Sequence, residues 1–597
     1  MSEAKLAEKY IPGGSFLYED VSPDKTFTPE DFSDEHKMIA ETTEDFVNNE
    51  VMPKADEIEE LKPELSVGLL RKAGEIGLLA VDIPEEYGGL GLDKTATMIV
   101  SEKIGKTGSW AVTYGAHSGI GTLPIVYFGN EGQKKKYLPK LASAEWVSSY
   151  SLSEPGSGSD ALSAKTTAVL SSDKKHYVLN GTKMWLTNAG FADLYITFAK
   201  VDGEHFTAFI IEKGTPGVSL GAEEKKMGIH GSSTRELILE NAKVPVENVL
   251  GEIGKGHKVA FNILNIGRFK LGAEVMGAMK EVTTNAVRYA KERHQFGQPI
   301  ANFGLIKHKL GEMAIKTFAA ESMVYRTAGL VDSILESAKP GAPNFEAITL
   351  KGIEEYAVEC SIIKVYNSEA LDYVVDEGVQ IYGGYGYSEE YPMARAYRDA
   401  RINRIFEGTN EINRLLMPGM LIRRATRGQL PILQKAKELL DEVLGFSMPE
   451  EIPDEFLAEE MRIIKNAKKI ALLMIGGAVQ KFLDKVRDEQ EVLGHIADIM
   501  MEVYAMESVV NRVKKMAQAQ GEEAVSIYVD VAKTYVNDAL NRVRLSAEQI
   551  LPIIESGDTL RTYMTMLRRF TKYTPINTAM ARRRIADHLV EAERYNL

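Results

Sequence analysis

Hydrophobic residues recur with helical spacing through the first quarter of the chain. The segments Glu35 to Val51 and Leu65 to Gly77 place apolar residues every three or four positions, which is typical of amphipathic helices. The run Asp82-Ile-Pro-Glu-Glu-Tyr-Gly-Gly-Leu-Gly91 interrupts this pattern and has the composition of a loop. Residues 27–145 are therefore predicted to form an α-helical domain. Residues 1–26, which proline and glycine punctuate, are predicted to form a surface arm before it.

The pattern changes at Trp146. Asn180-Gly181 and Val201-Asp202-Gly203 are typical of hairpin turns. Short segments rich in β-branched and aromatic residues surround them: Trp146–Ser153, Thr166–Leu170, His176–Leu179, Leu194–Val201, Phe206–Ile211 and Glu236–Leu239. Residues 146–255 are therefore predicted to form an antiparallel β-domain.

Helical periodicity returns at Gly256 and continues to the C-terminus. His257–Leu264, Glu281–Arg293 and Ile306–Ser333 are predicted helices, and the stretch Arg427-Gly428-Gln-Leu-Pro431 is a predicted boundary. Residues 256–428 thus form a predicted helical-bundle domain. Residues 429–597 form an additional α-helical domain, in which Pro453, Gly521 and Pro575 separate helices. The predicted fold class is α+β, mainly α.

Composition narrows the classes of function. The length of 597 residues suggests several domains, and the net charge of -14 argues against a nucleic-acid partner. The single cysteine, Cys360, excludes an intramolecular disulfide framework and a cysteine-based metal cluster, and no other metal site is predicted. The first residues lack the features of a secretory or transit peptide, and the longest uncharged apolar run, Ile470–Val479, is shorter than the roughly 20 residues of a membrane span. The expected compartment is the cytoplasm.

Glu407 is the first candidate for chemistry. It lies between the apolar pair Ile405-Phe406 and the sequence Gly408-Thr409-Asn410, which is typical of a helix start. An apolar setting disfavours the charged carboxylate and makes it more basic, as a general base that takes a weakly acidic proton requires. The alternative is an ordinary acidic residue near a helix N-terminus, where the helix dipole favours Glu.

Two segments of the β region are candidates for ligand binding. Ser151-Leu-Ser-Glu-Pro-Gly-Ser-Gly-Ser-Asp160 is a predicted tight turn whose hydroxyl and backbone N–H groups can hold polar edges or phosphates. In Lys183-Met-Trp-Leu-Thr-Asn188, Trp185 offers a flat apolar face and Thr187 a hydroxyl on the same side of a strand. A plain surface turn and a buried core Trp are the alternatives.

The segment around Glu407 and the two β-region segments resemble motifs of the acyl-CoA dehydrogenase family. Two further segments share this resemblance: Tyr289-Ala-Lys-Glu-Arg-His-Gln-Phe-Gly297 and Gln380-Ile-Tyr-Gly-Gly-Tyr-Gly386. The domain order also matches: helical, then β, then helical. The resemblance covers roughly residues 30–425 and rests on five motifs in register. The additional C-terminal helical domain is most similar to that of the very-long-chain acyl-CoA dehydrogenases.

The resemblance implies FAD-dependent dehydrogenation of a long-chain acyl-CoA to the trans-2-enoyl-CoA in fatty acid β-oxidation. Glu407 matches the base that removes the α-proton, while flavin N5 takes the β-hydride on the opposite face. Burial should raise the pKa of this carboxyl from about 4.3 toward about 6–7. The implied electron acceptor is electron-transferring flavoprotein.

The resemblance also carries over the cofactor contacts, residue by residue. The contacts implied for FAD within one subunit are Tyr150, Leu152, Ser153, Trp185, Thr187, Thr409 and Glu411. The contacts implied for the FAD of a neighbouring subunit are Arg293, Gln295, Phe296, Gln380, Gly383, Gly384 and Gly386. A site shared in this way requires at least a homodimer. For the glycines, a turn at a helix end is the alternative.

Four residues are implied on the substrate side: Ser159, Asn265, Arg268 and Gly408. For Arg268 the alternative is an ion pair on a helix surface. Some family members carry the base at the position of Gly267, which has no side chain and leaves Glu407 as the candidate.

Three questions stay open in the sequence. An acyl-CoA oxidase would use the same base and flavin with O₂ as electron acceptor. Gly119 and Gly121 leave room for a long acyl chain, or they allow close helix packing. The amphipathic segment Glu459 to Phe482 has a basic side, so it either lies on a membrane surface or partner or packs within its own domain.

Overall fold

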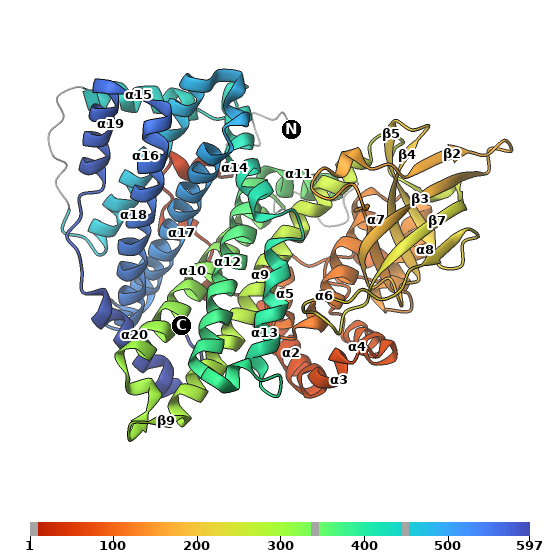
Figure 1. The fold of residues 1–597 in the computed structure, drawn as a ribbon, viewed down its shortest axis with the longest axis horizontal. Helices are drawn as coiled ribbons and strands as arrows, with labels where there is room; N and C mark the ends of the chain where they lie inside the picture. The colour runs from red at the N-terminus through yellow and green to blue at the C-terminus, as the bar shows by residue number, and fades with distance from the viewer. Residues whose placement is uncertain (1–9, 336–344, 445–452) are drawn as a thin grey trace.

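The computed structural model describes residues 10–335, 345–444 and 453–597. Seven α-helices of the described residues precede the sheet: α2 (Asp34–Phe46), α3 (Ala55–Glu59), α4 (Pro63–Glu75), α5 (Lys94–Gly105), α6 (Ser109–Gly115), α7 (Leu123–Phe128) and α8 (Glu131–Ala142). Ser33, Asp93 and Asn130 cap α2, α5 and α8 by accepting hydrogen bonds from backbone N–H groups of the first turn. In Figure 1, α2, α3 and α4 lie below the sheet.

The β-domain is one mixed sheet. Its strands are β1 (Ser148–Ser151), β2 (Thr167–Leu170), β3 (His176–Thr187), β4 (Leu194–Val201), β5 (His205–Glu212), β6 (Val218–Leu220), β7 (Thr234–Pro245) and β8 (Val249–Leu250). The strand order is β6-β7-β3-β2-β4-β5-β8, and β1 pairs with β4 off this path. The prediction of an antiparallel domain is right for most pairs, but both β1 and β2 pair with β4 in parallel.

One of the two predicted hairpin turns is wrong. Asn180-Gly181 lies inside β3, where the register against β7 shifts between Leu179 and Gly181, because long-range pairing with β7 carries the strand through the local turn sequence. The other turn is confirmed. Asp202 and Gly203 adopt φ of 52° and 78° and connect β4 to β5.

The central helices form the bundle: α9 (Gly256–Glu292), α10 (Gly304–Leu335), α11 (Phe345–Glu355), α12 (Ala357–Tyr382), α13 (Pro392–Ala400) and α14 (Asn410–Thr426). A small hairpin, β9 (His294–Gln295) and β10 (Gln298–Pro299), projects from the end of α9 (Figure 1). The two helices predicted over His257–Leu264 and Glu281–Arg293 are parts of the single long α9.

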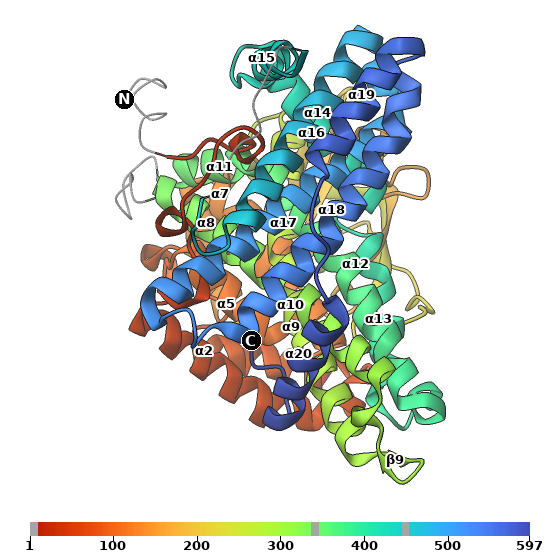
Figure 2. The ribbon, with the colours of Figure 1, turned by 90° about the vertical axis from the view of Figure 1, so that its left-hand side faces the viewer.

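The C-terminal helices are α15 (Ile432–Leu444), α16 (Ala458–Phe482), α17 (Gln490–Gln520), α18 (Ser526–Ile554), α19 (Gly557–Phe570) and α20 (Thr578–Ala592). Figure 2 shows α16–α18 running alongside the bundle helices. One hydrophobic core continues from Met279 of α9 and Ile362 of α12 to Val503 of α17 and Val536 of α18. Burial of this shared apolar surface attaches the additional helices firmly to the bundle.

The predicted surface arm is not on the surface in its described part, residues 10–26. Phe16 and Leu17 are buried, and the backbone N–H groups of Gly13 and Gly14 donate to the carboxylates of Glu355 and Glu359. Contacts with residues far away in the chain determine where this segment lies, and its local proline and glycine pattern does not show them. Residues 1–9 of the predicted arm lie outside the described residues.

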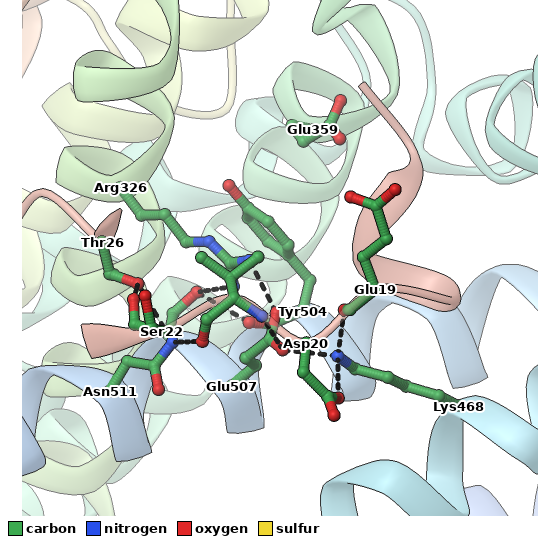
Figure 3. Close-up of polar contacts among 12 residues, drawn as sticks. Glu19, Asp20, Ser22, Thr26, Arg326, Glu359, Lys468, Tyr504, Glu507 and Asn511 are labelled. Atoms are coloured by element: carbon green, nitrogen blue, oxygen red, sulfur yellow. Dashed lines mark hydrogen bonds and ion pairs between the residues drawn. The ribbon is translucent and has the colours of Figure 1, made fainter. Parts of the chain in front are cut away.

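A buried charge cluster fixes this segment to the bundle and to the C-terminal helices. Glu507 of α17 accepts from Lys468 of α16 and, at 2.6 Å, from Arg326 of α10 (Figure 3). The N-terminal segment is hydrogen-bonded to α17 as well, because the Asn511 side chain donates to the carbonyl oxygen of Val21 at 2.8 Å. Glu507 is fully buried, so its two cations offset the cost of removing the carboxylate from water.

The apolar side of α16 faces the protein interior. Ile463, Ile464, Ala467, Ile470 and Ala471 are all buried in the shared core, and Lys468 of the basic side is buried beside Glu507. The reading of this helix as a membrane-surface helix is therefore wrong, because packing within the protein already covers its apolar face. Within the described residues, none of the helices combines the length and hydrophobicity that crossing a membrane requires.

Candidate active site

Glu407 lies in the short connection between the turn Arg401–Arg404 and α14. It adopts a positive φ of 57°, and Gly408 follows with φ of 79°. A left-handed conformation at a non-glycine residue costs about 1–3 kcal/mol and persists where surrounding contacts impose it. Thr409 then starts α14 as predicted for a cap, because its hydroxyl accepts the N–H of Ile412 at 3.2 Å.

Two buried cationic side chains donate hydrogen bonds to the backbone of this connection. Arg268 of α9 donates to the Glu407 carbonyl oxygen at 3.1 Å and to Asn265 Oδ1 at 2.9 Å. Lys364 of α12 donates to the Gly408 carbonyl oxygen at 2.8 Å and to Asn410 Oδ1 at 2.7 Å. The alternative reading of Arg268 as a surface ion pair is wrong, since it is 5% exposed and supports the backbone of the loop.

The environment of Glu407 makes its carboxyl basic. Burial raises its pKa to about 7, and the cations Arg268 and Lys364 offset part of that effect. Oxygen Oε2 is buried and has no hydrogen-bond partner among the described residues. A carboxyl with a pKa near neutral pH and an uncommitted oxygen is suited to accept a proton from a bound ligand.

Gly267 of α9 makes room for this carboxyl. A Cβ at position 267 would lie 2.6 Å from Glu407 Oε2 and 3.0 Å from its Cδ, well inside van der Waals contact. The missing side chain at position 267 is thus a steric requirement of Glu407.

A cavity of about 470 Å³ begins at Glu407, Gly267 and Thr187. It follows one face of α9, and its far end reaches Met52, Asp56 and Arg395. The lining positions on α9 are Gly267, Lys270, Leu271, Glu274, Val275, Ala278, Glu281, Val282 and Asn285. From Gly267 to Asn285 the helix rises by about 27 Å at about 1.5 Å per residue.

The two glycines considered for chain length differ in role. Gly119, in the π-helical turn Ala116–Gly121, lines the cavity, and a Cβ there would reach only ordinary contact with Lys270, at 3.8 Å. Gly121 is not part of the lining. Its Cβ would lie 2.3 Å from Ser148 Oγ, so close packing against β1 explains it.

The predicted flavin residues of the β-domain gather next to the mouth of the cavity. Thr187 lines it, and Trp185, with a φ of 64°, leaves 57% of its surface exposed, so it is not a core residue. The Tyr150 hydroxyl is buried without a hydrogen-bond partner among the described residues, and burial together with Glu407 raises its pKa well above the usual value.

The turn at Leu152 and Ser153 is anchored by a buried ion pair. Lys183 donates to the Leu152 carbonyl oxygen at 3.1 Å and to Glu154 Oε1 at 2.7 Å. The Ser153 carbonyl oxygen accepts the N–H of Met184 at 3.0 Å. The side chains of Ser159, at the far end of the turn, and of Glu411, in the first turn of α14, are exposed and do not line the cavity.

A second group of predicted residues lies at the opposite end of the bundle. Arg293, Gln295, Gly383 and Gly384 line a hollow of about 610 Å³ together with several tyrosines. Gln380 and Phe296 are exposed close by in sequence, and 93% of the Phe296 surface is accessible.

Gly383 and Gly384 have open space where a Cβ would lie, whereas a Cβ at Gly386 would lie 2.4 Å from the carbonyl oxygen of Val379. For Gly386, then, close packing against the end of α12 explains the glycine.

Four family models match the chain, and each is described as an acyl-CoA dehydrogenase domain. The N-terminal domain matches residues 33–145, the middle domain residues 149–242, and two C-terminal domains residues 254–419 and 466–569. The chain belongs to the acyl-CoA dehydrogenase family.

Similar proteins are known over the whole chain. A probable acyl-CoA dehydrogenase of Bacillus subtilis (strain 168) is 53% identical over 599 residues and covers 100% of both chains. The crystal structure of an acyl-CoA dehydrogenase complexed with FAD from Bacillus anthracis is 53% identical, covers 98% of this chain and 100% of that chain, and has a TM-score of 0.97. The very long-chain specific mitochondrial acyl-CoA dehydrogenase of Homo sapiens is 42% identical over 353 residues, which are 58% of this chain and 51% of that protein.

Several residues that shape this acyl-CoA dehydrogenase site were not identified from the sequence. Lys364 stands in the apolar run Cys360–Val365, and a lysine in such a run is a signal of a buried, paired charge. Lys183 lies inside a strand segment and gives the same signal. Glu274 lies in the middle of α9 and lines the cavity. The sequence of α9 does not show that this face of the helix borders a cavity, because that depends on how α6 packs against it.

Proposed function

We propose that the protein catalyses the α,β-dehydrogenation of acyl-CoA thioesters, with Glu407 as the base that removes the α-proton. The supporting observation is that Glu407, whose Oε2 has no hydrogen-bond partner among the described residues, lines a cavity that Thr187 also lines. The Arg268 and Lys364 cations keep the loop in place and limit the rise in pKa of the carboxyl, so that about half of it is ionised at neutral pH.

FAD is the proposed cofactor, and the residues beside the cavity suit it. The exposed face of Trp185, the Thr187 hydroxyl and the unpartnered Tyr150 hydroxyl offer stacking and hydrogen-bonding groups at one place. Leu152, Ser153, Thr409 and Glu411 complete the proposed set of contacts. When bound, FAD supplies the acceptor for the hydride that leaves the β-carbon.

The proposed substrates carry long acyl chains. The cavity follows α9 for about 27 Å. One leaflet of a bilayer hydrocarbon core, which a long acyl chain spans, is about 15 Å thick, so the cavity is longer than such a chain. Gly119 carries no side chain to narrow the cavity wall, so a long chain has room beyond the reacting carbons.

We further propose a homodimer in which Arg293, Gln295, Phe296, Gln380, Gly383 and Gly384 reach the FAD of the partner subunit. The hollow that contains four of them and the almost fully exposed Phe296 support this proposal. On the substrate side, Gly408 and Ser159 are the proposed CoA-facing residues, while Asn265 and Arg268 act through the loop they support. The proposed electron acceptor is electron-transferring flavoprotein.

Anaerobic titration of the purified flavoprotein with saturated acyl-CoAs of rising chain length tests this proposal. Bleaching of the flavin spectrum and a product lighter by two hydrogens are expected. Admission of air should then reoxidise the flavin slowly, whereas rapid peroxide formation would identify an acyl-CoA oxidase instead. A spectrum that no acyl-CoA bleaches would refute the proposed reaction.

A further inference from the structure

Glu274 places a second carboxyl group in the acyl cavity. It lies seven residues after Gly267 on the same face of α9, so it is about 10 Å further along the cavity at about 1.5 Å per residue. Its side chain is directed at α6, where a Cβ at Gly115 would lie 2.6 Å from Glu274 Oε1. Gly115 is thus the position that leaves space for this carboxyl.

No neighbouring group satisfies the Glu274 carboxyl. Among the described residues it has no hydrogen-bond partner and no ion pair within 4 Å. Lys270, one turn earlier on α9, directs its ammonium group to Asp82 Oδ2 at 3.3 Å, where Lys94 also pairs. The cation next to Glu274 is therefore committed to another carboxylate.

Burial raises the pKa of Glu274 to about 8, against the lowering effect of Lys270, while Glu407 adds to the rise. At neutral pH the group is mainly an uncharged acid, which carries one O–H donor and acceptor oxygens. An alkyl chain that fills the cavity displaces water from this acid and leaves its donor unpaired, which weakens binding.

We propose that Glu274 is a specificity-determining residue that selects acyl chains bearing a hydroxyl group in the middle of the chain. This inference rests on the proposed function, because it assigns the substrate class of the same cavity. A hydroxyl accepts the O–H of the acid and donates to its carbonyl oxygen, so it replaces the water that the chain displaces. An extended chain advances about 1.2 Å per single bond, so about 10 Å corresponds to eight or nine bonds beyond the α-carbon (C2), at about C10 or C11.

Binding without turnover tests this inference. In a Glu407→Gln background, the dissociation constants of hexadecanoyl-CoA and of its 10-, 11- and 12-hydroxy derivatives are measured from the perturbation of the flavin spectrum and by calorimetry. One of the hydroxy derivatives should bind about tenfold more tightly than the plain chain, as one well-placed hydrogen bond allows. A 4-hydroxy derivative, which places its hydroxyl short of Glu274, should show no such gain.

Substitutions at position 274 separate recognition from packing. Glu274→Leu keeps the volume without a polar group and should tighten binding of the plain chain while it removes the tenfold preference. Glu274→Gln keeps a hydrogen-bond donor and should retain part of the preference for the hydroxylated chain. Glu204→Gln, which changes an exposed carboxylate in the β4–β5 turn, is the matched control and should leave the ratio unchanged.

The outcomes distinguish this inference from the proposed reaction. If wild-type protein is bleached by hexadecanoyl-CoA but the hydroxy derivatives show no preference, or a preference that survives Glu274→Leu, the role of Glu274 is refuted and the reaction stands. If no acyl-CoA, plain or hydroxylated, bleaches the wild-type flavin, the proposed reaction itself fails.

Discussion

Gly267→Ala should slow the proposed reaction without harming the fold. The added Cβ would lie 2.6 Å from Glu407 Oε2, whereas nonbonded heavy atoms settle at about 3.5 Å, so the carboxylate oxygen must retreat by roughly 0.9 Å. The backbone of α9 itself cannot give way easily, because it is helical on both sides of position 267. The methyl group therefore displaces the base and leaves the helix intact.

A misplacement of about 1 Å costs about 100-fold in rate when reacting atoms must be in line. Replacing Gly by Ala inside a helix otherwise stabilises it by about 0.5–1 kcal/mol. We therefore expect the rate constant of anaerobic flavin bleaching to fall about 100-fold while the FAD content is unchanged and the melting temperature is unchanged or slightly higher.

Stopped-flow bleaching with a long-chain acyl-CoA measures this rate. Gly68→Ala, at a helical glycine with open space where its Cβ would lie, is the matched control and should bleach like the wild type. In the Gly267→Ala background, Glu407→Asp should cost less than it does alone, because the shorter side chain avoids the methyl group. Bleaching at the wild-type rate in Gly267→Ala would refute the steric account.

Three further results are expected. The bleaching rate constant should rise about tenfold between pH 6 and pH 8, because Glu407, with a pKa of about 7, must be ionised to act as a base; a flat profile would contradict this. Lys183→Met should lower the melting temperature and the FAD content, because it leaves Glu154 unpaired in a buried turn, at a cost of about 3–5 kcal/mol; unchanged unfolding and FAD content would exclude that role. Glu507→Gln should destabilise the protein by a similar amount, because it leaves the buried Arg326 without its carboxylate and Lys468 with only the partly exposed Asp20; a stability equal to that of Glu204→Gln would contradict this.

Local patterns in the sequence were sufficient for the class of fold and for the helix start that follows Glu407. The change in hydrophobic pattern at Trp146 comes two residues before the first strand, β1. The Gly408-Thr409-Asn410 sequence predicts a helix start, and α14 begins there in the structure. Both depend on residues close in sequence, namely β-branched alternation in the first case and a capping hydroxyl in the second.

The features that the sequence did not reveal depend on contacts distant in the chain. Pairing of β3 with β7 overrides the turn preference of Asn180-Gly181, and partners more than 300 residues away bury Phe16 and its neighbours. The face of α9 that carries Glu274 into the cavity is likewise set by the packing of α6 at Gly115. A helical period shows which residues share a face, but not which of several buried faces borders a cavity.

The measurement that bears most directly on Glu407 as the base is the anaerobic titration of Glu407→Gln with a long-chain acyl-CoA. The variant should retain FAD and perturb the flavin spectrum on binding, because the amide preserves the shape of the side chain, but the flavin should not bleach, because the amide cannot accept the α-proton. Bleaching of Glu407→Gln at the wild-type rate would contradict the assignment of Glu407 as the base.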